Sequence, residues 1–152
     1  MFAVHAPLAL PDPAATDRLA QVLAPLLHAG DTLLLQGEIG VGKTHFARAL
    51  IHALAGAQDV PSPTFTLVQT YEAADFDIWH ADLYRLTHPD EAIELGLDEA
   101  FGVALCLVEW PERLGADRPK QALTLRFLLS GDGREVAFLS DDTRWRGRLR
   151  DV

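Results

Sequence analysis

The sequence of 152 residues is poor in cysteine and lysine, lacks long apolar runs, and contains no asparagine. Its one cysteine, Cys106, excludes a disulfide within the chain, and its position in an apolar stretch indicates a small core residue. No apolar run is long enough to span a membrane, and the first residues lack the pattern of a signal peptide. We therefore expect a cytoplasmic protein without a membrane partner.

The composition is that of an ordinary globular domain, with 49% hydrophobic and 23% charged residues. A chain of this length can bury a core without disulfides or structural metals, so we expect one domain over residues 1–152. The net charge of −9 argues against a protein that coats nucleic acid unaided.

Positive charge collects at the end of the chain, in an alternating array formed by Arg144, Arg146, Arg148 and Arg150. In an extended segment all four guanidinium groups would lie on one side, as a docking edge for an acidic partner or an RNA backbone. The alternative is a solvated tail of about residues 141–152 that can be flexible. The sequence leaves both interpretations open.

Residues 37–44 match the phosphate-binding loop pattern G-x-x-x-x-G-K-[ST] without a mismatch. They are Gly37, Glu38, Ile39, Gly40, Val41, Gly42, Lys43 and Thr44. The apolar stretch at 32–35 predicts a buried strand before the loop, and the apolar spacing over 45–54 predicts a helix after it. Strand, glycine loop and helix together are the context that a phosphate loop requires.

The residue types suit the binding of a nucleotide. Glycines allow the loop to turn its N–H groups toward a phosphate, and the helix N-terminus adds partial positive charge. Lys43 would reach the β- and γ-phosphates, and the Thr44 hydroxyl would bind Mg²⁺. The alternative is a glycine turn with a solvated lysine. Lys43 is one of only two lysines in a chain that otherwise uses arginine, which favours the functional interpretation.

Two carboxylates could complete such a site. Glu109 ends an apolar strand at 105–109, in the form of a Walker B element, and is the better candidate for Mg²⁺. Asp82 ends a less apolar stretch and could hold an outer water or orient the attacking one. Trp110 follows Glu109, so its indole should lie beside the metal in the nucleotide site. His80, taken alone, indicates a structural residue.

The remaining pattern predicts an α/β fold. Asp12 and Pro13 open a helix that Pro25 should kink or stop. We expect one antiparallel hairpin from strands at 65–71 and 76–80, and a second from 122–129 and 135–139. A short helix at 90–95 and a buried parallel strand at 104–109 lie between them. The prediction is a three-layer P-loop NTPase fold with a mixed, mainly parallel central sheet and antiparallel hairpin additions.

Several motifs occur in the order and spacing of the TsaE (YjeE) family, and the chain resembles that family from about residue 10 to residue 112. Besides the phosphate loop they are S-P-T-F-T-L at 62–67, H-A-D-L-Y-R-L at 80–86, E-L-G-L at 94–97 and V-E-W-P-E at 108–112. The family is the bacterial P-loop ATPase needed to make N6-threonylcarbamoyladenosine in tRNA.

The resemblance implies ATP contacts from Glu38 to Thr44, and Mg²⁺ on Thr44 and Glu109. It places Asp82 at a position important for ATP turnover, Thr16 near the base, and residues 62–66 in a switch-like segment. It also implies TsaD-like and TsaB-like partners, with tRNA contacted only indirectly. The family usually has Asp and Thr where this chain has Glu38 and His45, and the match beyond residue 119 is loose.

Two other functions remain open from the residues alone. A small-molecule kinase also combines a phosphate loop with a compact α/β core, although basic residues for a lid are few. A nucleotide-gated binding module with little turnover would leave Asp82 structural. A GTPase is disfavoured, because the guanine signature [NT]-K-x-D is absent.

Overall fold

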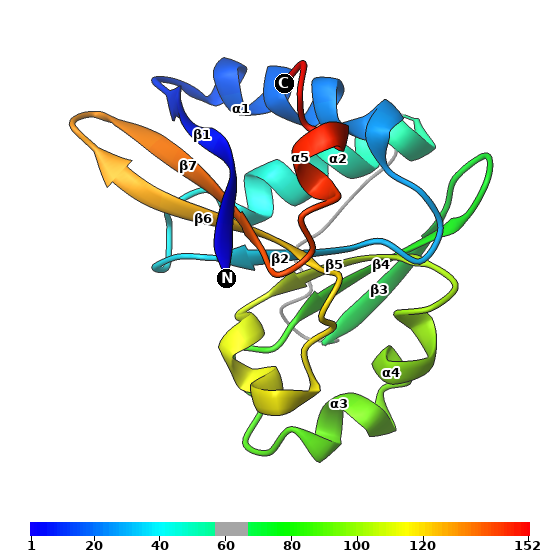
Figure 1. Ribbon diagram of the computed structural model, residues 1–152. Helices are drawn as coiled ribbons and strands as arrows, with labels where there is room; N and C mark the ends of the chain where they lie inside the picture. The colour runs from blue at the N-terminus through cyan, green and yellow to red at the C-terminus, as the bar shows by residue number, and fades with distance from the viewer. Residues whose placement is uncertain (57–66) are drawn as a thin grey trace.

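The computed structural model describes residues 1–56 and 67–152, which form a seven-stranded sheet flanked by helices (Figure 1). Across the sheet the strands follow in the order β1 (Phe2–Leu10), β7 (Gly133–Ser140), β6 (Leu123–Ser130), β2 (Thr32–Gln36), β5 (Leu105–Glu109), β4 (Asp77–Asp82) and β3 (Val68–Glu72). The central strands β6, β2, β5 and β4 are parallel, and the others pair antiparallel. The predicted mixed sheet with two antiparallel hairpins is confirmed.

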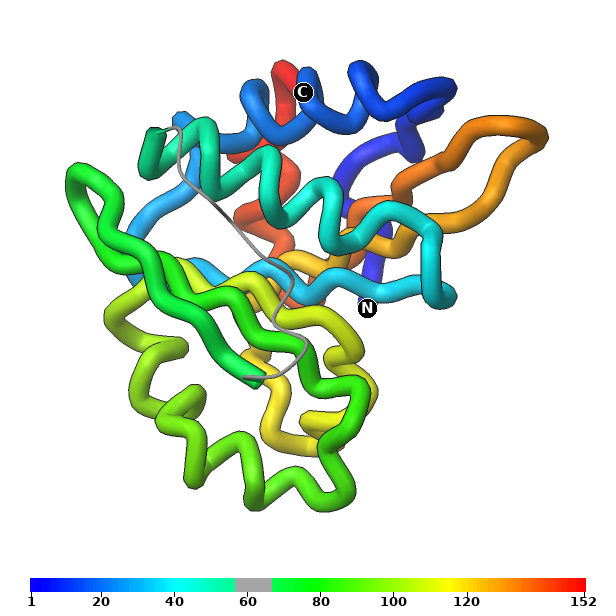
Figure 2. The backbone as a smooth tube through the Cα atoms, turned by 180° about the vertical axis from the view of Figure 1, so that it is seen from behind, coloured from blue at the N-terminus to red at the C-terminus, as the bar shows by residue number. Residues whose placement is uncertain are grey.

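Helices cover both faces of this sheet. Helix α2 (Lys43–Ala55) crosses one face and α1 (Pro13–Leu23) packs on it, while α3 (Asp90–Glu94) and α4 (Leu97–Ala100) lie on the other (Figures 1 and 2). On β2, Leu33 and Leu35 belong to the core cluster under α1 and α2, and Leu34 belongs to the opposite cluster. Because side chains alternate along a strand, one apolar run fills both layers.

The ends of α1 follow from its sequence. The Asp12 carboxylate accepts a hydrogen bond from the Ala15 N–H at 2.8 Å, and Pro13 occupies the first turn. The α-helix stops at Leu23, and a 3₁₀ turn at Ala24–Leu26 follows around Pro25. Both features were predicted, because a proline inside the helix removes a backbone donor.

Strand β1 was not predicted. Only Val4 and Leu10 are buried in it, so it lacks the alternating pattern of a half-buried strand. It lies at the sheet edge, its register with β7 shifts between His5 and Leu8, and an edge strand tolerates Pro7 between them. The strand exists because β7, from the other end of the chain, pairs with it.

The end of the chain does not form the extended segment that one of the two interpretations of the arginine array required. Residues Trp145–Arg148 form the short helix α5, in which Trp145 is buried. Arg148 donates to both carboxylate oxygens of Asp31, at 3.0 and 2.5 Å, and to the Leu26 carbonyl. The guanidinium also lies 4.0 Å from the centre of the Trp145 ring. The burial of an indole and a paired guanidinium favours helix over strand here.

No helix in the described part of the chain could cross a membrane.

Candidate functional site

The phosphate loop connects β2 to α2, and its shape requires glycine at two positions. Gly37 has φ +149°, and a Cβ there would lie 2.7 Å from both the Phe127 carbonyl oxygen and Val41 Cγ1. Gly42 has φ +109° and caps α2. Side chains are strained at such angles, so glycine allows the loop to wind tightly into the helix.

The N-terminus of α2 opens into a cavity of about 360 Å³. We call it the first cavity. Its lining residues are Ile39, Gly40, Gly42, Lys43, Thr44, His45, Asp82, Tyr84, Glu109 and Trp110. The helix has 13 residues, so its unpaired N–H groups and its dipole favour an anion at this end. The structure thus brings five of the eight loop residues together with both predicted carboxylates and Trp110, while Gly37, Glu38 and Val41 do not line this cavity.

Three side chains form a hydrogen-bonded row that begins at the wall of this cavity and continues into the core. The Thr44 hydroxyl donates to Glu109 Oε1 at 2.8 Å, and His80 Nε2 lies 2.7 Å from Glu109 Oε2. Glu109 is 2% exposed and His80 is fully buried. A buried carboxylate is stable only with such partners. Thr44 and Glu109 therefore present two oxygen atoms side by side.

Asp82 and Glu109 lie next to each other because of strand register. They close the parallel strands β4 and β5, and their Cα positions are paired across the two strands. Burial raises the pKa of Asp82 above that of a free aspartate, while a hydrogen bond from the Tyr84 N–H opposes this shift. Asp82 thus differs from Glu109, which is more deeply buried and bonded on both oxygens.

The Lys43 side chain turns back over its own loop. Its ammonium donates to the Gly37 carbonyl at 2.5 Å and lies 3.7 Å from the centre of the Trp110 ring. Burial lowers the pKa of Lys43, and Glu109 leads the carboxylates that oppose the shift. An ammonium surrounded by a ring and carboxylates is well placed to meet an anion in the cavity.

Trp110 has the one positive φ among the non-glycine residues described, at +59°. This conformation ends β5 sharply and turns the indole into the cavity wall, where it packs 4.9 Å from the Tyr84 ring. Trp110 and Glu109 thus line the same cavity. The contact of Trp110 with Lys43 was not foreseen, because it depends on the turn after the strand.

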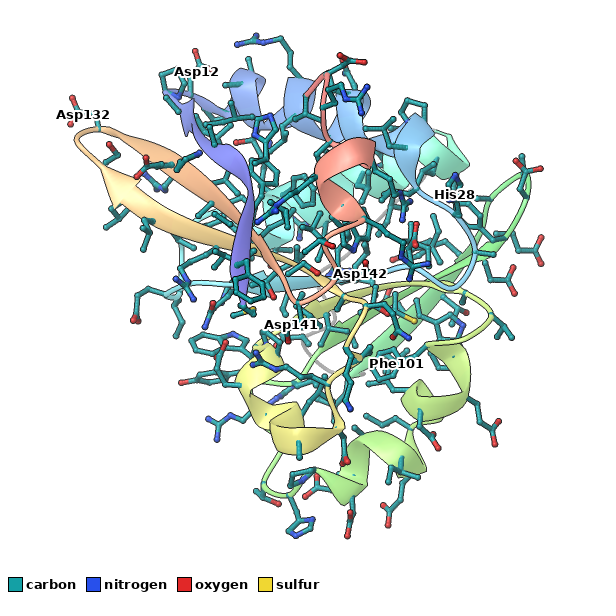
Figure 3. The ribbon with its side chains drawn as sticks, viewed as in Figure 1. Asp12, His28, Phe101, Asp132, Asp141 and Asp142 are labelled. Carbon is teal, nitrogen blue, oxygen red and sulfur yellow. The ribbon has the colours of Figure 1, made fainter. Side chains whose placement is uncertain are left out.

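Thr16 lines a second cavity of about 360 Å³, formed mainly by the start of α1 and the β6–β7 hairpin. Figure 3 shows Asp12 and Asp132, from these two elements, at the same end of the molecule. The hairpin closely approaches the segment between β1 and α1, since a Cβ on Gly133 would lie 2.7 Å from Pro11 Cα. The two cavities share Gly42 and His45, so they adjoin at the phosphate loop.

Two residues at the site were missed or undervalued by sequence reasoning. Arg134, on β7, donates from Nε to the Val41 carbonyl at 3.2 Å and so braces the phosphate loop from outside. No local pattern could reveal this contact, because the two residues are 93 positions apart. His80 had a detectable signal: it precedes Asp82 by two residues, so both point to one face of β4. The switch-like segment at 62–66 lies outside the described residues.

A glycine loop between a parallel strand and a helix, with carboxylates closing the neighbouring strands, defines the P-loop class of nucleotide-binding folds. Within this class the chain belongs to the TsaE family. The family model described as "Threonylcarbamoyl adenosine biosynthesis protein TsaE" matches residues 10–136.

The relatives carry the same description. The protein named "tRNA threonylcarbamoyladenosine biosynthesis protein TsaE" from Rickettsia conorii is 48% identical over 98 residues, which cover 64% of this chain and 56% of that protein. Its namesake from Rickettsia bellii is 38% identical over 84% of this chain and 89% of its own length. The protein of that name from Bacillus subtilis is 35% identical over 88% and 85%.

A solved structure supports the same fold. The crystal structure of YdiB from Bacillus subtilis superposes with a TM-score of 0.81 at 28% sequence identity. The superposition covers 96% of this chain and 92% of YdiB. The sheet and helices described above are therefore those of this fold over nearly its full length.

Proposed function

We propose that this chain binds and hydrolyses ATP as an accessory protein in the formation of N6-threonylcarbamoyladenosine in tRNA. The family description and the names of its relatives support the pathway. The observation that carries the ATPase part is the Thr44–Glu109 pair, bonded at 2.8 Å at the N-terminus of α2 beside the Lys43 ammonium. Hydroxyl, carboxylate and ammonium are the groups that phosphoryl transfer requires in a phosphate loop.

The phosphates would occupy the first cavity. Backbone N–H groups of the loop and of α2 donate to them, and the Lys43 ammonium exchanges the Gly37 carbonyl for phosphate oxygens. This exchange is favourable, because a charge-assisted hydrogen bond to an anion is stronger than one to a neutral carbonyl.

Mg²⁺ would be held by Thr44 and Glu109. The residues fit this ion, because both present hard oxygen donors from adjacent positions, and Mg²⁺ is usually bound by one or two protein groups together with phosphates and waters. When bound, the ion supplies positive charge that neutralises the phosphates. Glu109 is buried and fixed on both oxygens, so it cannot readily turn toward solvent.

Asp82 is proposed to orient the attacking water. It lies one strand from Glu109 and lines the same cavity, yet it is not bonded to Thr44 or Lys43 in the structure. A carboxylate at this place can accept a hydrogen bond from a water without occupying the metal side of the site. Its role is thus in turnover rather than in binding.

The second cavity would take the nucleoside. It adjoins the first at Gly42 and His45, and Thr16 contributes a buried hydroxyl to its wall. A ligand that extends through both cavities would place its phosphates at α2 and its base beside α1. This arrangement supports the assignment of Thr16 to the base.

The acidic surface supports a partner-dependent role. With a net charge of −9, the chain is poorly suited to hold RNA alone, so TsaD-like and TsaB-like proteins would contact the tRNA. Hydrolysis would then reset or dissociate the assembly, and turnover by the isolated chain should be weak.

Ligand-dependent thermal unfolding tests this function. At a hundredfold excess over Kd, a ligand bound only to the native state adds about 2.7 kcal/mol, or about 5–10 °C for a chain of this size. We expect this shift with Mg²⁺-ATP, a smaller one with GTP, and almost none for Lys43→Ala. The matched control is Lys120→Ala, which changes the other, exposed lysine. Equal shifts for ATP and GTP would remove the adenine assignment, and phosphate transfer to small metabolites would favour a kinase.

A further inference from the structure

His80 is a buried histidine whose polar contact is made inside the site. Its side chain is fully buried in the middle of β4, and Nε2 lies 2.7 Å from Glu109 Oε2. The other oxygen of Glu109 accepts from Thr44. The carboxylate is thus held between two partners, one on the metal side and one behind it.

We propose that His80 is a positioning residue that fixes the orientation of the Glu109 carboxylate for Mg²⁺. By occupying Oε2, His80 leaves Oε1 to face Thr44 and the cation. The inference rests on the proposed function, and it assigns to His80 a role in metal affinity rather than in contact with the nucleotide.

The physical reason lies in the freedom of a glutamate side chain. The terminal torsion of glutamate is broad, so a carboxylate without partners samples many orientations. A hydrogen bond from behind the metal ligand removes that freedom in advance, and groups of this kind typically tune metal affinity. The bond is strong here, because neither partner is exposed to solvent.

The chemistry of the ring agrees with this role. An ionised Glu109 Oε2 can only accept a hydrogen bond, so His80 Nε2 is the donor in this contact. Nδ1 has no hydrogen-bond partner among residues 1–56 and 67–152, which suits a lone pair better than an N–H. This tautomer directs the one donor of the ring at Glu109.

A purely structural role would not require a polar residue here. Ile78, two positions earlier on the same face of β4, fills an equally buried place with an apolar side chain. Burial of an imidazole costs free energy unless it is hydrogen-bonded, and among the described residues His80 makes its hydrogen bond to the proposed metal ligand. The hydrogen bond to Glu109 therefore explains why a polar residue occupies position 80.

The test measures how Mg²⁺ changes nucleotide affinity. The dissociation constant of ADP would be determined by calorimetry in EDTA and over a series of Mg²⁺ concentrations, for the wild type, three His80 variants and one control variant. His80→Leu removes the hydrogen-bond donor. His80→Asn has a shorter side chain whose N–H cannot reach Glu109, and His80→Gln retains an N–H at a similar distance from the backbone. His88→Leu is the control, since His88 is an exposed histidine elsewhere.

We expect His80→Leu and His80→Asn to raise the Mg²⁺ concentration for half-maximal effect by about 10–100-fold, with ADP affinity in EDTA unchanged. His80→Gln should restore most of the loss, and His88→Leu should match the wild type. If His80→Leu does not fold, the comparison of His80→Asn with His80→Gln decides whether the inference holds.

If the His80→Asn variant showed the Mg²⁺ dependence of the wild type, the inference would be overturned and the proposed function would stand. Equal loss of ADP affinity with and without Mg²⁺ would also overturn it, because His80 would then support the whole pocket. If the wild type itself bound no nucleotide, the proposed function would fail and the inference with it.

Discussion

The Lys43 ammonium lies 3.7 Å from the centre of the Trp110 ring. One residue belongs to the phosphate loop and the other follows strand β5, so the contact joins the two halves of the site. A cation over an indole is attracted by the ring face, and a phosphate bound in the loop would compete for the same cation. The emission of Trp110 should therefore report on ligand binding.

We predict that Mg²⁺-ADP changes tryptophan fluorescence and that Trp110→Phe abolishes the change. The chain has three tryptophans, and Trp79→Phe is the control because Trp79 does not line the first cavity. Trp145 stays unaltered in both variants, since it is buried in the core. A ligand-dependent signal that survives in Trp110→Phe would show that Trp110 is remote from the ligand.

The two carboxylates should separate binding from turnover. Glu109→Ala removes a proposed Mg²⁺ ligand and leaves buried His80 without its partner, so we expect weaker Mg²⁺-dependent binding. Asp82→Asn should retain binding nearly intact and lower hydrolysis, by about 10²-fold or more if Asp82 orients the water. Calorimetry and phosphate release measure the two effects. Lost binding in Asp82→Asn with normal binding in Glu109→Ala would exchange their roles.

The C-terminal segment should contribute to stability. Arg148→Ala breaks the paired contact with Asp31 and the stacking on Trp145, so we expect the free energy of unfolding to fall by about 2 kcal/mol. Arg146→Ala, an exposed change in the same short helix, should have almost no effect. Urea unfolding measures both variants. Equal stabilities would mean that the Arg148 contacts add nothing.

Cys106 should be unreactive in the folded protein. Burial in β5 raises the pKa of its thiol to about 12, so little thiolate exists at about pH 8. A disulfide reagent should label it slowly under native conditions and rapidly in concentrated guanidinium chloride. Rapid native labelling would show that β5 opens readily to solvent.

Much of the site could be predicted from the sequence, because its signals are local. Loop residues 37–44 are contiguous, and Asp82 and Glu109 each follow an apolar stretch that marks a strand. Parallel strands bring their carboxyl ends to one edge, so two separate strand ends meet without any further information. The hairpins were found for the same reason, since turn and strand signals lie close together.

The features that were missed depend on distant partners. Strand β1 forms on β7, and Arg134 reaches the Val41 carbonyl across 93 positions. The arginine array alternates in sequence, yet Arg148 folds back on Asp31 because the guanidinium finds a carboxylate and an indole there. Spacing alone cannot choose between a strand and a short helix when tertiary contacts decide.

The central claim is that this chain supports threonylcarbamoyladenosine formation through its ATP site. The most direct measurement is mass spectrometry of digested tRNA from cells depleted of the protein and complemented with variants. We expect the modified nucleoside to be lost on depletion, restored by the wild type and by Lys120→Ala, and not restored by Lys43→Ala. Normal levels of the modified nucleoside in depleted cells, or full restoration by Lys43→Ala, would contradict the account.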